Sequence, residues 1–176
     1  MLSGLRREGE RSALRVWNGS RHLAGVGHPR LGATPRRTVW TRDSAELWRY
    51  GTGHASPRPP ILLVPSVVSR SYVMDLLPGN SMVEFLLRDG FDVFLLDWGE
   101  PDASDAANTL ATYCEDYLPA AISAVLREAR ADRLGLVGYC LGGVMSLLAL
   151  AASPHLPVSG LALLAPPVDF RHMGHL

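Results

Sequence analysis

The segment Gly138-Tyr139-Cys140-Leu141-Gly142-Gly143 combines residue types that could perform covalent chemistry. Cys140 supplies a thiol, whose ionised form is a strong nucleophile. Gly138 and Gly142 stand two residues before and after it, which suits a turn so tight that side chains there would collide with the neighbouring strand or helix. Gly-x-Cys-x-Gly is typical of a nucleophile on a strand-to-helix turn, although a structural cysteine in a glycine-rich turn would give the same pattern.

The residues that flank this segment favour the catalytic interpretation. Residues 134–137 form a short apolar run typical of a buried strand, and residues 141–152 form an apolar stretch that favours a helix ending before Pro154. Cys140 would then lie at the carboxyl end of a strand and the amino end of a helix, where the helix dipole favours negative charge. The Leu141 N–H is the first expected oxyanion donor, and the second should come from the loop at residues 64–68.

Apolar runs without alternation predict the sheet that must position this turn. Such runs are expected where both faces of a parallel sheet are covered. They occupy residues 61–64, 93–96, 134–137 and 161–164. Residues 38–41 and 46–50 are rich in β-forming side chains, and the turn-prone Asp43 and Ser44 between them suggest a hairpin.

Helical segments alternate with these strands. Residues 81–88 form one such segment, which Gly90 closes, and residues 110–129 form a longer one with an apolar stripe at helical spacing. Pro119 should kink the longer helix or mark its true start. Strands that alternate with helices predict a doubly wound α/β fold with a mostly parallel sheet.

The first 34 residues differ in composition from the rest of the chain. Residues 1–37 hold eight Arg and two acidic residues, while the whole chain has a formal net charge of zero. We expect residues 1–34 to be a mobile Arg/Gly-rich leader and residues 35–176 to form one α/β domain. Such a leader could contact nucleic acid or anionic lipid, but it lacks interleaved aromatic residues, so no nucleic-acid partner is expected.

The two cysteines and the absence of a long apolar run set the expected compartment. Cys114 and Cys140 are too few for a disulfide framework and lack metal-ligand spacing, so we expect a reducing cytoplasm and no metal. Cys114 lies inside the long predicted helix and is interpreted as structural. The longest apolar run, residues 144–152, is too short to cross a bilayer, and no signal peptide is evident.

From about Pro35 to Met173 the chain resembles the polyhydroxyalkanoate synthases, the bacterial polyester polymerases, and in particular their shorter catalytic subunits. Besides the glycine-flanked cysteine, the matching segments occur in the family's order. They are residues 46–50, 69–81, 90–99, 116–119 and 165–170. The resemblance implies an α/β-hydrolase fold in which Cys140 is the nucleophile and Val68 and Leu141 supply the oxyanion donors.

The resemblance also implies a reaction. Cys140 would accept a 3-hydroxyacyl group from coenzyme A, and the hydroxyl of a growing polyester would attack the resulting thioester with the help of a His base and an Asp. A thiol that attacks a thioester forms another of nearly equal free energy, which suits an enzyme that passes acyl groups onward. The substrate carries the coenzyme A, and no other cofactor is implied. The family further implies a homodimer or a second synthase subunit, at the surface of cytoplasmic polyester granules.

The resemblance implies that the catalytic Asp and His, which complete a triad with the Cys in this family, lie beyond residue 176. Asp169 follows a predicted strand but belongs to a segment interpreted as structural, and His172 and His175 are too close to the end of the sequence to fold back over Cys140. We therefore expect the amino-terminal part of an α/β-hydrolase fold, lacking its last strands and helices and nearly inactive alone. An esterase or thioesterase, or a non-catalytic fragment, are the alternatives.

Overall fold

The computed structural model describes residues 16–17, 20, 30–51, 57–169 and 171. The chain divides into two compact units, Met1–Arg30 and Leu31–Leu176. Most of the predicted leader lies outside the described residues; in the first unit, the described Val16, Trp17 and Ser20 are helical. The fold described below is that of the second unit.

The first residues of the second unit are bonded to its body. The Gly32 N–H donates to the carbonyl oxygen of Asp75 at 2.8 Å. The Thr34 hydroxyl donates to Asp75 Oδ1 at 2.6 Å, and its N–H donates to Oδ2 at 3.1 Å. The Asp75 side chain is buried, so these bonds satisfy a carboxylate that water hardly reaches. Residues 32 and 34, which the sequence assigned to the leader, therefore have fixed partners.

Six strands form one sheet in the order β1-β2-β4-β3-β5-β6. Their bounds are β1 (Arg36–Arg42), β2 (Ala45–Tyr50), β3 (Ile61–Val64), β4 (Val93–Asp97), β5 (Leu134–Tyr139) and β6 (Val158–Leu164). The predicted hairpin is confirmed: β1 pairs antiparallel with β2, and Asp43 in the turn has a φ of 49°. β2 is antiparallel to β4, whereas the β4–β3, β3–β5 and β5–β6 pairs are parallel, as predicted for the buried strands.

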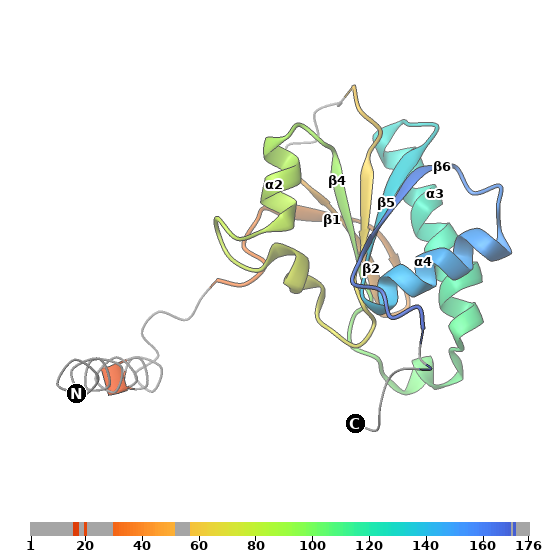
Figure 1. Ribbon diagram of the computed structural model, residues 1–176, viewed down its shortest axis with the longest axis horizontal. Coiled ribbons are helices and arrows are strands. Elements are labelled where there is room, and N and C mark those ends of the chain that lie inside the picture. Colours follow the sequence, from red (N-terminus) through yellow and green to blue (C-terminus); the bar gives the residue numbers. More distant parts are fainter. Residues whose placement is uncertain (1–15, 18–19, 21–29, 52–56, 170, 172–176) are drawn as a thin grey trace. The chain divides into compact units, whose positions relative to one another are not determined.

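Helices cover both faces of this sheet (Figure 1). α2 (Met82–Arg88) lies on one face, and α3 (Leu118–Ala129) and α4 (Leu141–Ala152) lie on the other. Ser81 caps α2 by accepting the Glu84 N–H at 3.0 Å. The short helices η1 (Ser71–Asp75) and η2 (Ala103–Ala107) were not predicted, because single turns carry too little periodicity.

The long predicted helix at residues 110–129 changes character at Pro119. A π-helical segment, η3 (Thr112–Tyr117), precedes the regular α-helix, which starts at Leu118 with Pro119 in its first turn. Proline has no N–H to donate and would crowd the carbonyl four residues earlier in a regular helix, so it suits a helix start. Residues 110–111 are already helical, so Pro119 marks the point at which the helix becomes regular and not its first turn.

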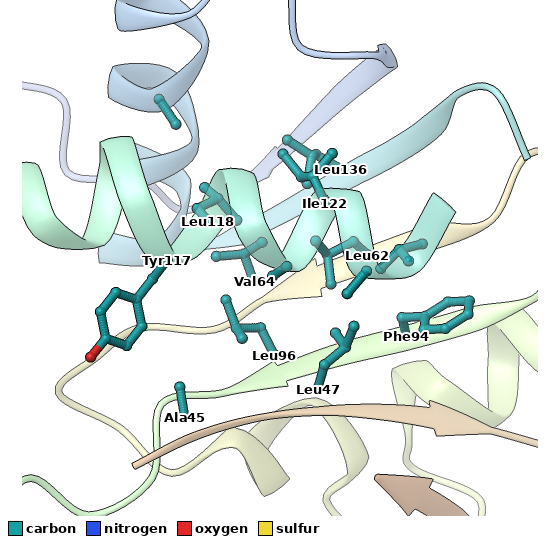
Figure 2. Packing of buried hydrophobic residues seen from close by; sticks show 14 of the residues in the cluster. Ala45, Leu47, Leu62, Val64, Phe94, Leu96, Tyr117, Leu118, Ile122 and Leu136 are labelled. Atoms are coloured by element: carbon teal, nitrogen blue, oxygen red, sulfur yellow. The ribbon is translucent and has the colours of Figure 1, made fainter. Parts of the chain in front are cut away.

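Side chains from α3 and the central strands form the larger hydrophobic core (Figure 2). Leu118 and Ile122 of α3 pack with Leu62 and Val64 of β3 and with Leu136 of β5. The opposite face of the sheet has its own cluster with α2, to which Leu63, Val83 and Leu95 belong. Burial on both faces explains the unbroken apolar runs of β3 and β4. The prediction of a buried strand at residues 161–164 is wrong, because β6 lies at the edge of the sheet and is only partly buried. None of the helices described has the length and apolar character needed for a bilayer crossing.

Candidate active site

Cys140 is the single residue between β5 and α4, at the carboxyl edge of the parallel strands. Its backbone has φ 53° and ψ −125°, a region that residues with side chains rarely adopt and that is often strained at functional sites. The turn is held at both ends: the Cys140 N–H donates to the Leu164 carbonyl at 2.9 Å, and the Cys140 carbonyl accepts the Gly143 N–H at 3.0 Å. The residue remains half-exposed.

Gly138 and Gly142 fill places where no side chain fits, and Gly143 has little room for one. A Cβ on Gly138 would lie 2.5 Å from the Gly143 Cα. A Cβ on Gly142 would lie 2.3 Å from the Val64 carbonyl oxygen and 2.4 Å from that of Pro65. The predicted collisions with a neighbouring strand and helix are therefore present. They also show that the turn at residues 138–143, here called the elbow, packs directly on the loop after β3.

The loop after β3, residues 65–70, is here called the β3 loop. Its Val68, the predicted second oxyanion donor, has a side chain that is 80% exposed. The Val68 N–H donates to the hydroxyl of the buried Ser66 at 3.3 Å, and the Ser66 carbonyl accepts the Ser69 N–H at 3.3 Å. In this structure the Val68 donor is thus engaged within its own loop, and its catalytic role stays a prediction. Leu141, the first predicted donor, is the first residue of α4, so its N–H has no earlier acceptor within the helix.

The chain's other thiol has a different environment. Cys114 lies in η3, is only 3% exposed and belongs to the larger hydrophobic cluster. Burial raises the pKa of the Cys114 thiol, and the nearby Glu115 carboxylate adds to this effect. A buried thiol that resists ionisation packs as a small apolar group, in accordance with the structural interpretation.

The acid and base that could serve Cys140 are not assembled among the described residues. Asp169 instead pairs with the neighbouring Arg171, through Nη2–Oδ2 at 2.8 Å, and these hydrogen bonds lower the pKa of its carboxyl group. His155, which the sequence reading did not consider, lies in the turn between α4 and β6. That turn is at the amino edge of the sheet, opposite to Cys140. His172 and His175 lie outside the described residues, in which no cluster of three potential metal ligands is found.

The sequence analysis assigned no role to Asp97 or Trp98, although Trp98 binds the start of the β3 loop and Asp97 binds the residue that follows it. The Trp98 indole Nε1–H donates to the Pro65 carbonyl at 2.9 Å, and the indole is 8% exposed. The Asp97 carboxylate accepts the hydroxyl of Ser71, which begins η1 just after the loop, at 2.6 Å. The available signal was the tryptophan itself, which directly follows a buried strand at the edge where the elbow lies.

The fold and the elbow agree with a match to a known family. The family model for the alpha/beta hydrolase fold matches residues 59–175. This range includes the parallel strands, the elbow and the helices on both faces of the sheet. The chain therefore belongs to the α/β-hydrolase family.

Within that family its relatives are polyester polymerases. The model for the amino terminus of poly-beta-hydroxybutyrate polymerase (PhaC) matches residues 2–86. Poly(3-hydroxyalkanoate) polymerase subunit PhaC of Thiocystis violacea is 32% identical over 164 residues, which are 92% of this chain and 46% of that protein. The subunit of the same name from Allochromatium vinosum is 37% identical over 144 residues, covering 80% and 40%. The predicted resemblance is confirmed, and the chain spans less than half the length of these relatives.

Solved structures show the same fold at low sequence identity. A sugar hydrolase from Lactococcus lactis superposes with a TM-score of 0.58 at 18% identity, over 81% of this chain and 60% of that protein. A putative lipase from Acinetobacter baumannii gives a TM-score of 0.54, also at 18% identity, over 90% and 48%. At such identities these structures support the fold and leave the reaction open.

Proposed function

We propose that Cys140 is the nucleophile of a polyhydroxyalkanoate synthase-type acyltransferase. The observation that carries this proposal is the partly exposed Cys140 on a turn with φ 53°, packed through Gly142 onto the β3 loop. Kinship with the poly(3-hydroxyalkanoate) polymerase subunits supports the choice of acyl transfer over other reactions that the fold hosts.

The proposed chemistry has two acyl transfers. The Cys140 sulfur attacks the carbonyl of a 3-hydroxyacyl-coenzyme A, the bond to the coenzyme A sulfur breaks, and the coenzyme A thiol leaves with the proton from Cys140. The hydroxyl of a growing polyester then attacks the Cys140 thioester, which forms an ester and regenerates the thiol. In each step the negative oxygen of the tetrahedral intermediate is stabilised by the N–H groups of Leu141 and Val68.

The described residues place the nucleophile Cys140 and the β3 loop at the carboxyl edge of the parallel strands. Among these residues, no base lies at the same edge. A Cys thiol that is partly ionised can attack an activated thioester without help, but the polyester hydroxyl needs a base to become nucleophilic. We therefore propose that the chain as it stands carries out the first transfer slowly and the second hardly at all. The segments that its longer relatives possess beyond the matched region are the proposed source of the base and its acid partner.

The remaining elements of the proposal follow from kinship. The substrate brings its own coenzyme A, so no further cofactor is proposed. The matched relatives are named as subunits, which supports assembly as a homodimer or with a second synthase subunit. The proposed location is the cytoplasm, at the surface of polyester granules.

The proposal can be tested by mixing the chain with 3-hydroxybutyryl-coenzyme A and quantifying three products: coenzyme A, free 3-hydroxybutyrate and polymer. We expect release of up to one equivalent of coenzyme A per chain, with little acid or polymer. Cys140→Ala should abolish this release, whereas Cys114→Ala should retain it. Release by Cys140→Ala at the native rate would refute the proposal.

The same products separate the alternative functions. Continuous release of free 3-hydroxybutyrate would indicate a thioesterase, in which water takes the place of the polyester hydroxyl. If the native chain releases no coenzyme A at all and gains no bound acyl group, it is a non-catalytic member of the family.

A further inference from the structure

The last residue of β4 and the three residues after it, residues 97–100, are bonded to the β3 loop and to Ser71 at three points. Trp98 Nε1–H donates to the Pro65 carbonyl at the start of the loop. Arg70 at the end of the loop pairs with Glu100 at 2.7 Å. The Ser71 hydroxyl, one residue further, donates to Asp97 Oδ1. We call residues 97–100 the β4 segment.

The β4 segment is itself fixed from its other side. The Trp98 ring meets Tyr113 of η3 edge-on, with ring centroids 5.5 Å apart, and the Trp98 carbonyl accepts the Ser44 hydroxyl at 3.2 Å. Gly99 has φ 74°, and a Cβ there would lie 2.0 Å from the Ser44 carbonyl oxygen. The turn of the β1–β2 hairpin therefore packs against the back of this segment, which makes it a rigid support.

The Pro65 carbonyl connects this support to the elbow. Its oxygen accepts the indole N–H of Trp98 at 2.9 Å. The same oxygen lies only 2.4 Å from the position that a Cβ on Gly142 would occupy. The start of the β3 loop is thus held between a buried tryptophan and the first turn of α4. This contact joins the start of the β3 loop to the turn that carries Cys140.

From these contacts we infer that Trp98 is a positioning residue: it holds Pro65, at the start of the β3 loop, against the first turn of α4 and so keeps the loop in place beside Cys140. At the far end of the loop, the Ser71 hydroxyl donates to the Asp97 carboxylate at 2.6 Å. The Arg70–Glu100 pair contributes less, because both side chains are largely exposed. The part of this inference that concerns oxyanion stabilisation rests on the proposed function. The part that concerns loop position does not.

The test replaces Trp98 by Phe, which removes the indole N–H but keeps an aromatic ring. Hydrogen exchange of the amides of residues 66–70 should become about five- to tenfold faster, the effect of losing one hydrogen bond. Trp48→Phe is the matched control, because the Trp48 Nε1–H donates to Glu46 on β2, away from the loop. If the exchange of residues 66–70 is the same in Trp98→Phe and in Trp48→Phe, the inference is wrong.

A second readout separates loop position from the nucleophile itself. Acylation of Cys140 by 3-hydroxybutyryl-coenzyme A passes through an oxyanion, whereas its alkylation by iodoacetamide does not. Trp98→Phe should slow acylation roughly ten- to a hundredfold and leave alkylation within twofold. An equal loss of both rates would assign Trp98 a role in folding or in thiol exposure instead.

The two readouts also distinguish failure of this inference from failure of the proposed function. If the native chain is never acylated but Trp98→Phe loosens the loop, the proposed function fails and the positioning role stands. If the native chain is acylated but Trp98→Phe leaves the loop unaffected, the proposed function stands and the positioning role fails. Should Trp98→Phe fail to fold, Ser71→Ala serves as the second variant, with a smaller expected increase in the exchange of residues 66–70.

Discussion

The elbow and the β3 loop meet at Pro65, yet they are held in place by different means. The elbow is shaped by the absence of side chains. A Cβ on Gly138 or Gly142 would lie 2.5 Å or less from a neighbouring backbone atom, and a Cβ on Gly143 would lie 3.1 Å from one. The β3 loop is shaped by side chains that arrive from elsewhere, among them the Trp98 indole and the Asp97 carboxylate.

This difference predicts how the two regions respond to change. The close backbone contacts of the elbow cannot accommodate an added Cβ, because backbone atoms cannot rotate away as a side chain can. Bonds made by side chains can be removed one at a time, and each contributes only a modest share. The elbow should therefore fail as a unit, whereas the loop should loosen in steps.

The largest effect is expected for Gly142→Ala. The new Cβ would fall between the Val64 and Pro65 carbonyl oxygens, so β3 and α4 would have to separate. We expect the free energy of unfolding to fall by about 2 to 3 kcal/mol, as measured by urea denaturation. Gly160→Ala is the control, because a Cβ there meets nothing within 4 Å, and its effect should stay within about 0.5 kcal/mol. Equal stability of the two variants would remove the basis of the comparison.

The exposure of the elbow can be tested against the buried thiol of the same chain. Cys140 is half-exposed, whereas burial raises the pKa of Cys114. At pH 8 iodoacetamide should therefore alkylate Cys140 faster than Cys114, by a factor on the order of ten or more. Raising the pH to 10 should narrow this ratio, because more of Cys114 then ionises. Faster labelling of Cys114 at pH 8 would contradict the assigned burial.

A smaller effect is expected for Ser71→Ala in the loop region. The change removes the hydroxyl that donates to the Asp97 carboxylate at 2.6 Å, but the half-exposed carboxylate can bind water instead. We expect a loss of about 1 kcal/mol in the free energy of unfolding. Ser123→Ala is a suitable control, because the exposed Ser123 hydroxyl donates only to the Pro119 carbonyl of its own helix. A loss as large as that of Gly142→Ala would show that the loop, too, fails as a unit.

The smallest effect is expected for Arg70→Gln. The side chains of Arg70 and Glu100 are 55% and 76% exposed, so water and salt screen their attraction. The variant should lose no more than about 0.5 kcal/mol at low salt and nothing measurable in 0.5 M NaCl. A loss that persists at high salt would mean that this pair is more than a surface ion pair.

Local patterns predicted the elbow and most of the elements around it. Glycine spacing, apolar runs and the position of Pro119 each depend on neighbours in sequence, which is why the turn at Cys140 and the parallel strands could be inferred before any coordinates. The bonds of Gly32 and Thr34 to Asp75 could not be predicted from local patterns, because they join residues about 40 positions apart.

The support of the β3 loop could not be predicted in the same way. Trp98 and Pro65 are 33 residues apart, and nothing in either local segment indicates the other as its partner. Likewise the π-helical segment η3 contacts α4, which lies later in the chain, and local periodicity indicates neither this contact nor the π-helical form. The sequence also did not indicate that the Val68 N–H donates to the Ser66 hydroxyl, because this bond depends on the conformation of the loop.

The central claim, that Cys140 becomes acylated, is tested most directly by peptide mapping. The two thiols fall in different tryptic peptides, residues 89–127 for Cys114 and residues 134–171 for Cys140. After incubation with 3-hydroxybutyryl-coenzyme A and an acid quench, mass spectrometry should find one 3-hydroxybutyryl group on the peptide 134–171 and none on 89–127. Acylation confined to the Cys114 peptide, or spread equally over both, would contradict the assignment of Cys140 as the nucleophile.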